Sequence, residues 1–504
     1  MTTLKPAFVN LIPLSKSIKN DTYYINYRNP MTLLLKNSTY REHVINQKAV
    51  IMDQRVFEKN ETPMAKCHVI IVLNSTQSGS GWSADKFIKK KKDIYRDCHI
   101  QCVEEKALAV MIQSFKNKYG TIYIMGTQHL FTYMTQINKF SIDTLFIQLY
   151  ERTGYATLEE YEKEKKEWGE SLDVFSPPDF LKSYALDAFT KEKNNTLLCY
   201  RKSQMEEINS HEKEYLNLLT DILTNGKERP DRTGVGTVGL FGRQLRFDLT
   251  SSIPLLTTKK MAWKSVVKEL LWFLSGDTNS KTLEKQNVNI WKGNTSRDFL
   301  DKRRLYKYAE GDVGPLYPFS FRHYGADYEG AGKDYSQKGY DQWSHLLHGL
   351  RHDPFSRRHL MTTFNPAVVP QCVLPPCHGI AIQFYVERPE ANDPYDLKCH
   401  VYCRSSDTFL GLPFNIASYA ILTYIVAKLC DMKPCELIIS TGDTHIYKNH
   451  IDQVKEQLKR TALPPPKLMV KDTIKDKDIT EVSLSDFELI GYFSHPPIKA
   501  DMAI

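Results

Sequence analysis

The sequence predicts a chain of two domains, the first of which has an α/β fold. Its 504 residues exceed the length at which a single hydrophobic core is usual. Before residue 201, short β-rich runs alternate with helical stretches, which is the pattern of an α/β domain. A polar stretch at 202–212 precedes a segment at 215–223 with apolar residues at helical spacing. We therefore expect one domain at 1–204 and a second at 205–504.

Six β-rich runs define the first domain, at 9–14, 49–52, 68–73, 121–125, 143–149 and 196–200. Between the third and fourth runs, the spacing of apolar residues at 107–118 predicts a helix. The charged segment at 158–170 has no sustained apolar stripe, which indicates a surface helix or a loop.

The composition limits the class of protein. With 41% hydrophobic and 11% aromatic residues, the chain has ample apolar material for packed cores. No apolar run reaches the roughly 18 residues of a membrane span, and the first residues lack the pattern of a secretion signal. Ten cysteines without a CxxC pair indicate reduced thiols, with neither a disulfide framework nor a metal centre. We expect a cytoplasmic protein with no membrane partner.

The net charge of +8 does not by itself indicate a nucleic-acid partner. The densest basic run, at 86–92, contains one aromatic residue and no recognisable motif. We interpret it as solvated surface and expect no DNA partner. A positive net charge also favours the binding of ligands that carry phosphate or polyglutamate groups.

Cys377 is the first candidate catalytic residue, in the segment LPPCHGIAIQFY at 374–385. Two prolines fix the backbone ahead of it, and the alternating apolar residues behind it predict a strand that forms a rigid base. A free thiol with a pKa near 8.5 is only about 3% thiolate at pH 7, so a nucleophilic cysteine needs positive charge nearby. Four arginines are candidates, although each alone could as well end a turn, face solvent or pair with a carboxylate: Arg232, Arg357, Arg358 and Arg404.

Five motifs carry a family resemblance: PDRTG at 230–234, KELLWFLSGDTN at 268–279, PPCH at 375–378, RSSDTFLGLPFNIASY at 404–419 and GDTHIY at 442–447. In this order, and with the terminal MAI at 502–504, they resemble thymidylate synthases over nearly all of 211–504. The resemblance implies an α+β domain with a large mixed sheet and helices. It also implies reductive methylation of dUMP to dTMP by 5,10-methylenetetrahydrofolate, with release of dihydrofolate.

The same resemblance implies roles for single residues. Cys377 matches the nucleophile that adds to carbon 6 of uracil, and Glu269 matches the acid/base that organises water. Tyr317 and His378 match residues that order water for proton transfer. The residues that match dUMP contacts are Arg232, Arg357, Arg358, Arg404, Ser405, Asn415, His445 and Tyr447. The residues that match folate contacts are Lys259, Ile290, Trp291, Asn294, Asp407, Leu410, Phe414 and Ala503.

These sets divide by the part of the ligand that they match. The four arginines and Ser405 match phosphate contacts, Asn415 the amide that reads the pyrimidine edge, and His445 with Tyr447 the pair that binds the 3′-hydroxyl. Asp407 matches the carboxylate that binds the pterin, and Lys259 a contact to the glutamate tail. Arg357 and Arg358 match residues that reach into the partner's site, so a homodimer is implied.

Two segments depart from the family pattern. PFSFR at 318–322 stands where Gly-(Phe/Lys)-Gln-Trp-Arg is usual, and Cys403 replaces a usual Gln or Glu.

Two alternative functions of the second domain are disfavoured by single residues. The related dCMP hydroxymethylases prefer Asp where Asn415 stands, which disfavours that activity. A non-catalytic folate- or RNA-binding protein is a third alternative, which the presence of Cys377 and Glu269 disfavours, because a binder needs no nucleophile.

The first domain resembles dihydrofolate reductase through its β-rich runs at 49–52, 69–73 and 122–126, as in the bifunctional enzymes of protists and plants. The residues expected for its chemistry are altered. Thr32 stands where the family carries an acid, Asp53 begins the segment where Gly-Arg is usual, and Thr127 replaces a glycine. We predict a degenerate reductase domain, unless another acid such as Asp21 or Glu42 fills the role. The alternative is a bifunctional enzyme that also reduces dihydrofolate with NADPH.

Overall fold

A computed structural model of the chain describes residues 209–501 apart from 389–392. Before residue 209 it describes the strands β1 to β11 and single positions at 89, 108, 112 and 181. The chain divides into two compact units, Met1–Ile208 and Asn209–Ile504. Each unit is described by itself below.

The N-terminal unit contains a sheet in the order β10-β11-β9-β1-β8-β3-β5-β7, with β2 paired to β1. Its strands are β1 (Ala7–Lys16), β2 (Tyr23–Ile25), β3 (Ala49–Asp53), β5 (His68–Leu73), β7 (His99–Glu104), β8 (Thr121–Met125), β9 (Thr144–Tyr150), β10 (Tyr184–Glu192) and β11 (Asn195–Lys202). A separate small sheet pairs β4 (Met64–Ala65) with β6 (Tyr95–Arg96). The pairs from β9 to β7 are all parallel, whereas β10 and β11 are antiparallel additions.

All six predicted strands of this unit are confirmed, and three strands of the large sheet were missed, namely β2, β7 and β10. The predicted helix at 107–118 lies mostly outside the described residues, and the charged segment at 158–170 lies wholly outside them. A mainly parallel sheet agrees with the predicted α/β class.

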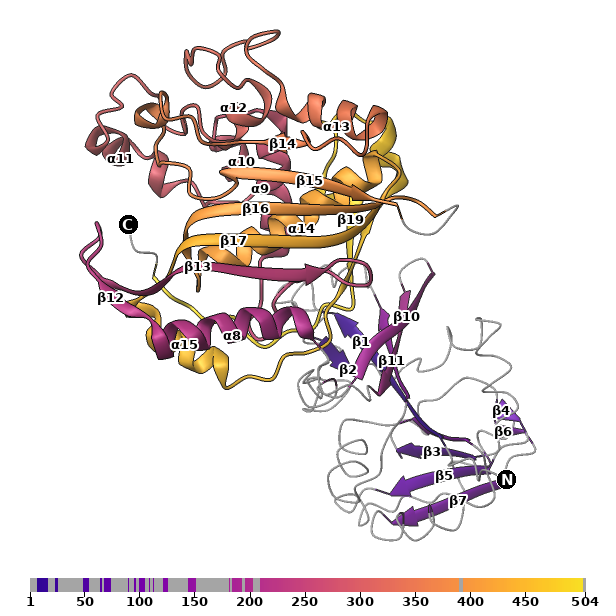
Figure 1. Cartoon of the computed structure of the whole chain (residues 1–504). Helices are drawn as coiled ribbons and strands as arrows, with labels where there is room; N and C mark the ends of the chain where they lie inside the picture. Colours follow the sequence, from indigo (N-terminus) through magenta and orange to yellow (C-terminus); the bar gives the residue numbers. More distant parts are fainter. Residues whose placement is uncertain are drawn as a thin grey trace. The chain divides into compact units, whose positions relative to one another are not determined.

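The C-terminal unit is built on a six-stranded sheet in the order β12-β13-β17-β16-β15-β14 (Figure 1). The strands are β12 (Lys227–Arg229), β13 (Thr237–Asp248), β14 (Leu360–Met361), β15 (Ala381–Glu387), β16 (Asp396–Asp407) and β17 (Lys433–Tyr447). Only β16 and β17 run parallel. The sheet is therefore mixed, as the resemblance implied. A two-stranded sheet pairs β18 (Lys467–Val470) with β19 (Phe487–Ile490).

Helices cover one face of the large sheet. The α-helices are α8 (Ser210–Asn225), α9 (Trp263–Ser275), α10 (Lys281–Glu284), α11 (Arg297–Lys302), α12 (Tyr317–Arg322), α13 (Gln342–His352), α14 (Gly411–Leu429) and α15 (Ile451–Leu458). Short 3₁₀ turns lie at η2 (Gly293–Thr295), η3 (Val369–Gln371), η4 (Lys448–His450), η5 (Asp472–Asp476) and η6 (Leu484–Asp486). Helix α8 packs on β13, and α14 packs on β16 and β17 (Figure 1).

Alternation along the strands decides which face is buried. Residues two apart in a strand point to the same face of the sheet. Phe247, Val401 and Ile439 lie on the face that carries the helices, and all three are buried. Helix α14 is apolar on all sides, since it lies inside the core. Among the described helices it alone has the length and composition of a membrane span, and 72% of that stretch is buried in the protein.

Candidate active site

The Cys377 loop enters β15 beside the first residue of α12. The backbone N–H of Cys377 donates to the Tyr317 hydroxyl at 3.0 Å, and the same hydroxyl lies 3.6 Å from the Cys377 sulfur. On the other side, the Ser405 N–H points to the Cys377 carbonyl at 3.5 Å. The thiol is half-buried. Contacts from α12 and β16 therefore fix the position of the sulfur.

Arg404 is the arginine that the structure places beside this thiol. Its Nε donates to the Pro376 carbonyl at 2.6 Å, and its Nη2 to the Pro375 carbonyl at 3.1 Å. Burial raises the pKa of the Cys377 thiol, whereas the Tyr317 hydroxyl and the Arg404 charge act in the opposite direction. Arg404 thus both holds the loop and favours the thiolate.

His378 packs flat on Tyr317, with ring centroids 4.3 Å apart and an interplanar angle of 14°. Its Nδ1 lies 2.7 Å from the Tyr419 hydroxyl. Burial lowers the pKa of His378 to about 4, so the ring is neutral near pH 7 and orders hydrogen bonds without adding charge. Gly379 has φ 61°, and a Cβ there would lie 2.3 Å from the Tyr419 oxygen. The loop therefore requires glycine at this point.

Glu269 lies on α9 and accepts a hydrogen bond from Trp291 Nε1 at 2.8 Å. Burial raises the pKa of Glu269 to about 7, although the Trp291 hydrogen bond acts in the opposite direction. Trp291 also packs edge-on against Tyr317, with centroids 6.3 Å apart. The carboxyl group therefore belongs to the same aromatic cluster as the Cys377 loop, and both of its protonation states are populated near neutral pH.

Asp407 ends β16 and shapes the turn into α14. Its Oδ1 accepts from the N–H groups of Phe409 at 3.0 Å and Leu410 at 3.1 Å. Asn415 follows in the second turn of α14, half-buried, and its amide forms no side-chain hydrogen bond with a residue that the structure describes. The amide is thus available to a ligand.

Lys259 lies beneath this turn and is only 6% exposed. Its Nζ donates to the Phe409 carbonyl and lies 3.7 Å from the centroid of the Phe409 ring. Burial lowers the pKa of Lys259 to about 7, and Asp407 acts in the opposite direction. Lys259 thus supports the Asp407 turn in this structure, and its expected contact to a glutamate tail stays a prediction.

The parallel pair β16 and β17 brings the nucleotide candidates to one end of the sheet. Asp407 is the register partner of His445. His445 Nδ1 lies 2.9 Å from Asp443 Oδ1, and its ring packs edge-on against Tyr447 at 5.2 Å. The carboxyl ends of parallel strands are the usual place for ligand sites in open sheets.

Arg232 lies in the loop that leads into β13, where Thr237 is the register partner of Tyr447. Asp231 shapes this loop, because its carboxylate accepts from the N–H groups of Thr233 at 2.9 Å and Gly236 at 2.7 Å. The Arg232 side chain is exposed at the same end of the sheet.

The remaining expected site residues differ in how far they are exposed. Arg357 and Arg358 are exposed in the loop between α13 and β14, and neither guanidinium forms a hydrogen bond or ion pair within the described part of the chain. Four wall candidates are partly buried: Ile290, Asn294, Leu410 and Phe414. Ala503 lies outside the described residues. Among the residues described, no group of three or more His, Cys, Asp or Glu could hold a metal ion.

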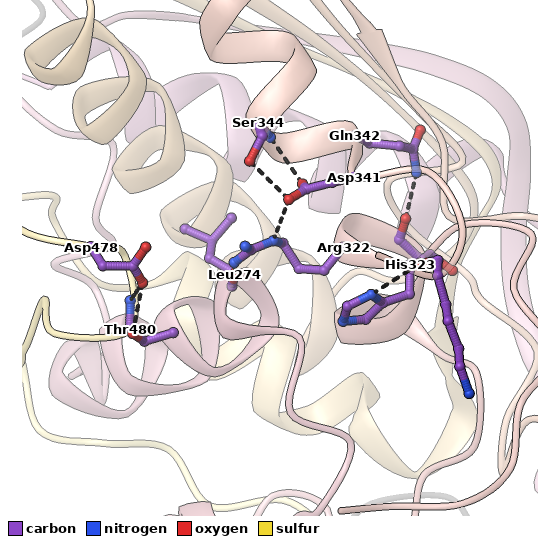
Figure 2. A network of polar contacts seen from close by, with 10 residues as sticks. Leu274, Arg322, His323, Asp341, Gln342, Ser344, Asp478 and Thr480 are labelled. Atoms are coloured by element: carbon purple, nitrogen blue, oxygen red, sulfur yellow. Dashed lines mark hydrogen bonds and ion pairs between the residues drawn. The ribbon is translucent and has the colours of Figure 1, made fainter. Parts of the chain in front are cut away.

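The altered motif at 318–322 still anchors α12 to its neighbours, through a residue that the sequence analysis did not single out. Arg322 donates from Nη1 to the Leu274 carbonyl at 3.0 Å and from Nε to Asp341 at 3.1 Å. Figure 2 shows the contact between Arg322 and Asp341. Asp341 in turn caps α13 by accepting from the Ser344 N–H at 3.0 Å. Arg322 thereby joins the end of α9, which carries Glu269, to the start of α13. In the sequence, the only feature that pointed to Arg322 was its place at the end of a motif that departs from the family pattern.

Comparisons with known proteins show which family the chain resembles. The family model for thymidylate synthase matches residues 213–504. A thymidylate synthase of Saccharomyces cerevisiae is 47% identical over 305 residues, which cover 60% of this chain and 99% of the yeast protein.

Two bifunctional dihydrofolate reductase-thymidylate synthases differ in how much they match. The protein of Zea mays is 44% identical over 293 residues, which cover 58% of this chain and 54% of that protein, so the match spans about half of its length. The protein of Paramecium tetraurelia is 34% identical over 491 residues, covering 95% of this chain and 96% of its own length. This chain belongs to the thymidylate synthase family.

Proposed function

We propose that this protein methylates dUMP to dTMP with 5,10-methylenetetrahydrofolate and releases dihydrofolate. The observation that carries the proposal is the Cys377 thiol, held between Tyr317 and Arg404, in one aromatic cluster with a Glu269 carboxyl group whose pKa is about 7. A binding protein needs no such nucleophile. An acid and base for proton transfer is most effective when its pKa lies near the working pH.

The chemistry follows from these groups. The Cys377 thiolate forms a bond to carbon 6 of uracil, and the displaced electron pair makes carbon 5 a nucleophile toward the folate methylene carbon. Carbon 5 then loses its proton to water ordered by Glu269. Tetrahydrofolate departs from the methylene carbon and returns a hydride to it, which leaves dihydrofolate. The methyl group is complete, and the carbon–sulfur bond breaks to restore the thiolate.

The remaining residues are assigned to binding. Arg232, Arg404 and Ser405 hold the phosphate, and Asn415 offers its unpartnered amide to the uracil edge. His445 and Tyr447 bind the 3′-hydroxyl. Asp407 binds the pterin, and Lys259 contacts the glutamate tail. The wall of the folate site consists of Ile290, Trp291, Asn294, Leu410 and Phe414, with Ala503 from the C-terminus. We also propose a cytoplasmic location, in keeping with the free thiols of the C-terminal unit, which are Cys372, Cys377, Cys399, Cys403, Cys430 and Cys435.

A release assay tests the proposed reaction. Incubation with dUMP tritiated at carbon 5 should release tritium into water only when methylenetetrahydrofolate is present, because that hydrogen leaves after the folate carbon is attached. Release at the same rate without folate, or none with it, would reject the assignment.

We further propose a homodimer that forms through the face of the large sheet opposite the helices. On that face Tyr385 is 53% exposed, Tyr402 39% and Leu360 52%, whereas their strand neighbours Phe384 and Val401 are buried. Large exposed apolar side chains on one sheet face are typical of a protein–protein interface. A second copy on this face would also give the free Arg357 and Arg358 side chains a phosphate to bind.

A mixture of two inactive variants tests this arrangement. Arg358→Glu removes the cation offered to the partner, and Cys377→Ala removes the nucleophile of its own site. After subunit exchange, about a quarter of the sites should be intact, because hybrids make up half of the dimers and each has one complete site. Absence of recovery, once mass spectrometry has verified hybrid dimers, would place the arginines in their own subunit's site.

For the N-terminal unit we propose a dihydrofolate-reductase-like fold with little or no reductase activity. The fold proposal rests on the mainly parallel sheet and on the alignment with the bifunctional Paramecium protein. The activity proposal rests on the sequence. Thr32 and Thr127 lie outside the described residues, and Asp53 is the last residue of β3. Thr32 has no carboxylate that could assist protonation of the pterin. The negative charge of Asp53 disfavours binding of the NADPH phosphates.

Purified full-length chain should therefore show no dihydrofolate-dependent NADPH oxidation at the roughly 1 per second of ordinary enzymes. Its methylation activity in the same preparation is the control for correct folding. Oxidation at or above that rate would restore the bifunctional interpretation with NADPH as cofactor.

A further inference from the structure

We propose that His348 and His352 on α13 form a binding site for a divalent transition-metal ion. The two residues lie one helical turn apart, and both side chains are exposed. Their rings stack with centroids 4.1 Å apart and an interplanar angle of 20°. Histidines four apart on a helix can bind one metal ion from the same face. The site is separate from the Cys377 site and does not depend on the proposed function.

The hydrogen bonding of His352 leaves a ring nitrogen ready for a metal. Its Nδ1 lies 2.8 Å from the His348 backbone carbonyl. A carbonyl oxygen only accepts, so Nδ1 carries the proton and Nε2 carries the lone pair. A second ring nitrogen that donates to a backbone carbonyl is the usual outer support of a metal-binding histidine. The His348 ring forms no side-chain hydrogen bond with any described residue, so its nitrogens are also open to a ligand.

The distances are compatible with one shared ion. Imidazole nitrogens bind zinc at about 2.0–2.1 Å, so two nitrogens on one ion lie roughly 3 Å apart. The ring centroids are 4.1 Å apart, and rotation of the two rings out of their stack would turn one nitrogen lone pair of each toward a shared ion. No third protein ligand accompanies them in the described part of the chain, so water would complete the coordination. Imidazole ligands favour copper, nickel and zinc over calcium or magnesium.

The helix under the pair is firmly held. At its start, Asp341 caps α13 and is bonded to Arg322 (Figure 2). Its inner face buries Trp343 and Leu350 in the core. Ligands on a rigid element keep their mutual geometry, which favours binding of a metal ion. The absence of CxxC pairs in the sequence predicted no metal centre, whereas this pair depends on the spacing of two histidines.

Titration of the full chain with Ni²⁺ and Zn²⁺ by calorimetry tests the proposal. Wild type should bind one ion that His348→Gln and His352→Gln each weaken at least ~10-fold. His345→Gln is the matched control, because His345 is exposed on the same helix but stacks on Tyr340, 4.3 Å away. Its affinity should equal that of wild type.

A second measurement locates the ion. Bound Ni²⁺ should protect His348 and His352, and not His345, from modification by diethyl pyrocarbonate, as mapped by mass spectrometry. Equal affinity of wild type and both pair variants, or equal modification of the three histidines with and without metal, would overturn the proposal.

Discussion

Cys377→Ala is expected to abolish dTMP formation without unfolding the protein. Removal of a covalent nucleophile typically lowers turnover by on the order of a thousandfold or more, because no other group can add to carbon 6. The hydrogen bond from the Cys377 backbone N–H to Tyr317 does not involve the thiol, so the loop keeps its support. Turnover and thermal unfolding of the variant give the measurement.

Cys435→Ala is the matched control for this variant. Cys435 is also a half-buried free cysteine, but it lies near the start of β17, away from the Cys377 loop. It should retain the wild-type turnover. A folded Cys377→Ala protein with near-normal activity would remove Cys377 from the role of nucleophile.

Glu269→Gln should lower turnover by ~10²–10⁴, the range for a lost general acid or base. Glutamine keeps the acceptor oxygen for Trp291 but cannot exchange a proton. The dependence of turnover on pH should also lose the inflection that a group with a pKa of about 7 produces in wild type. Lys264→Gln, on an exposed position of the same helix, is the control and should keep both rate and profile. An unchanged profile in Glu269→Gln would exclude Glu269 as the group that titrates.

The raised pKa of Glu269 also predicts the sign of a stability effect. The folded protein binds this proton more tightly than the unfolded chain, so the stabilising contribution is present below the ordinary pKa of 4.5 and is lost as the pH rises through about 7. Wild type should therefore lose more thermal stability than Glu269→Gln as the pH rises from about 4.5 to about 7. A larger loss in the variant would contradict the assignment.

Much of the fold followed from local patterns. The six predicted strands in the N-terminal unit come from mainly apolar runs, whereas β7 (HIQCVE) and β10 (YALDAFTKE) contain more polar and charged residues and gave a weaker signal. The mixed sheet of the second unit came from the family resemblance. Strand pairing depends on contacts distant in sequence, which local spacing does not reveal.

The sequence allowed candidate site residues to be named, but it did not reveal their contacts. The backbone N–H of Cys377 donates to the hydroxyl of Tyr317, 60 positions away in the sequence, and no spacing rule connects the two residues. The burial of Lys259 under Phe409 was missed for the same reason, because a lysine in sequence looks like a surface cation. The role of Arg322 in joining α9 to α13 follows from its hydrogen bonds, which the sequence does not reveal. The assigned roles in binding dUMP and folate stay predictions.

The most direct test of the central claim is a stoichiometric assay of the purified chain with dUMP and methylenetetrahydrofolate. We predict dTMP and dihydrofolate in equal amounts, since the folate supplies both the carbon and the hydride. Formation of hydroxymethylated nucleotide with tetrahydrofolate, or binding of both ligands without any product, would contradict the assignment.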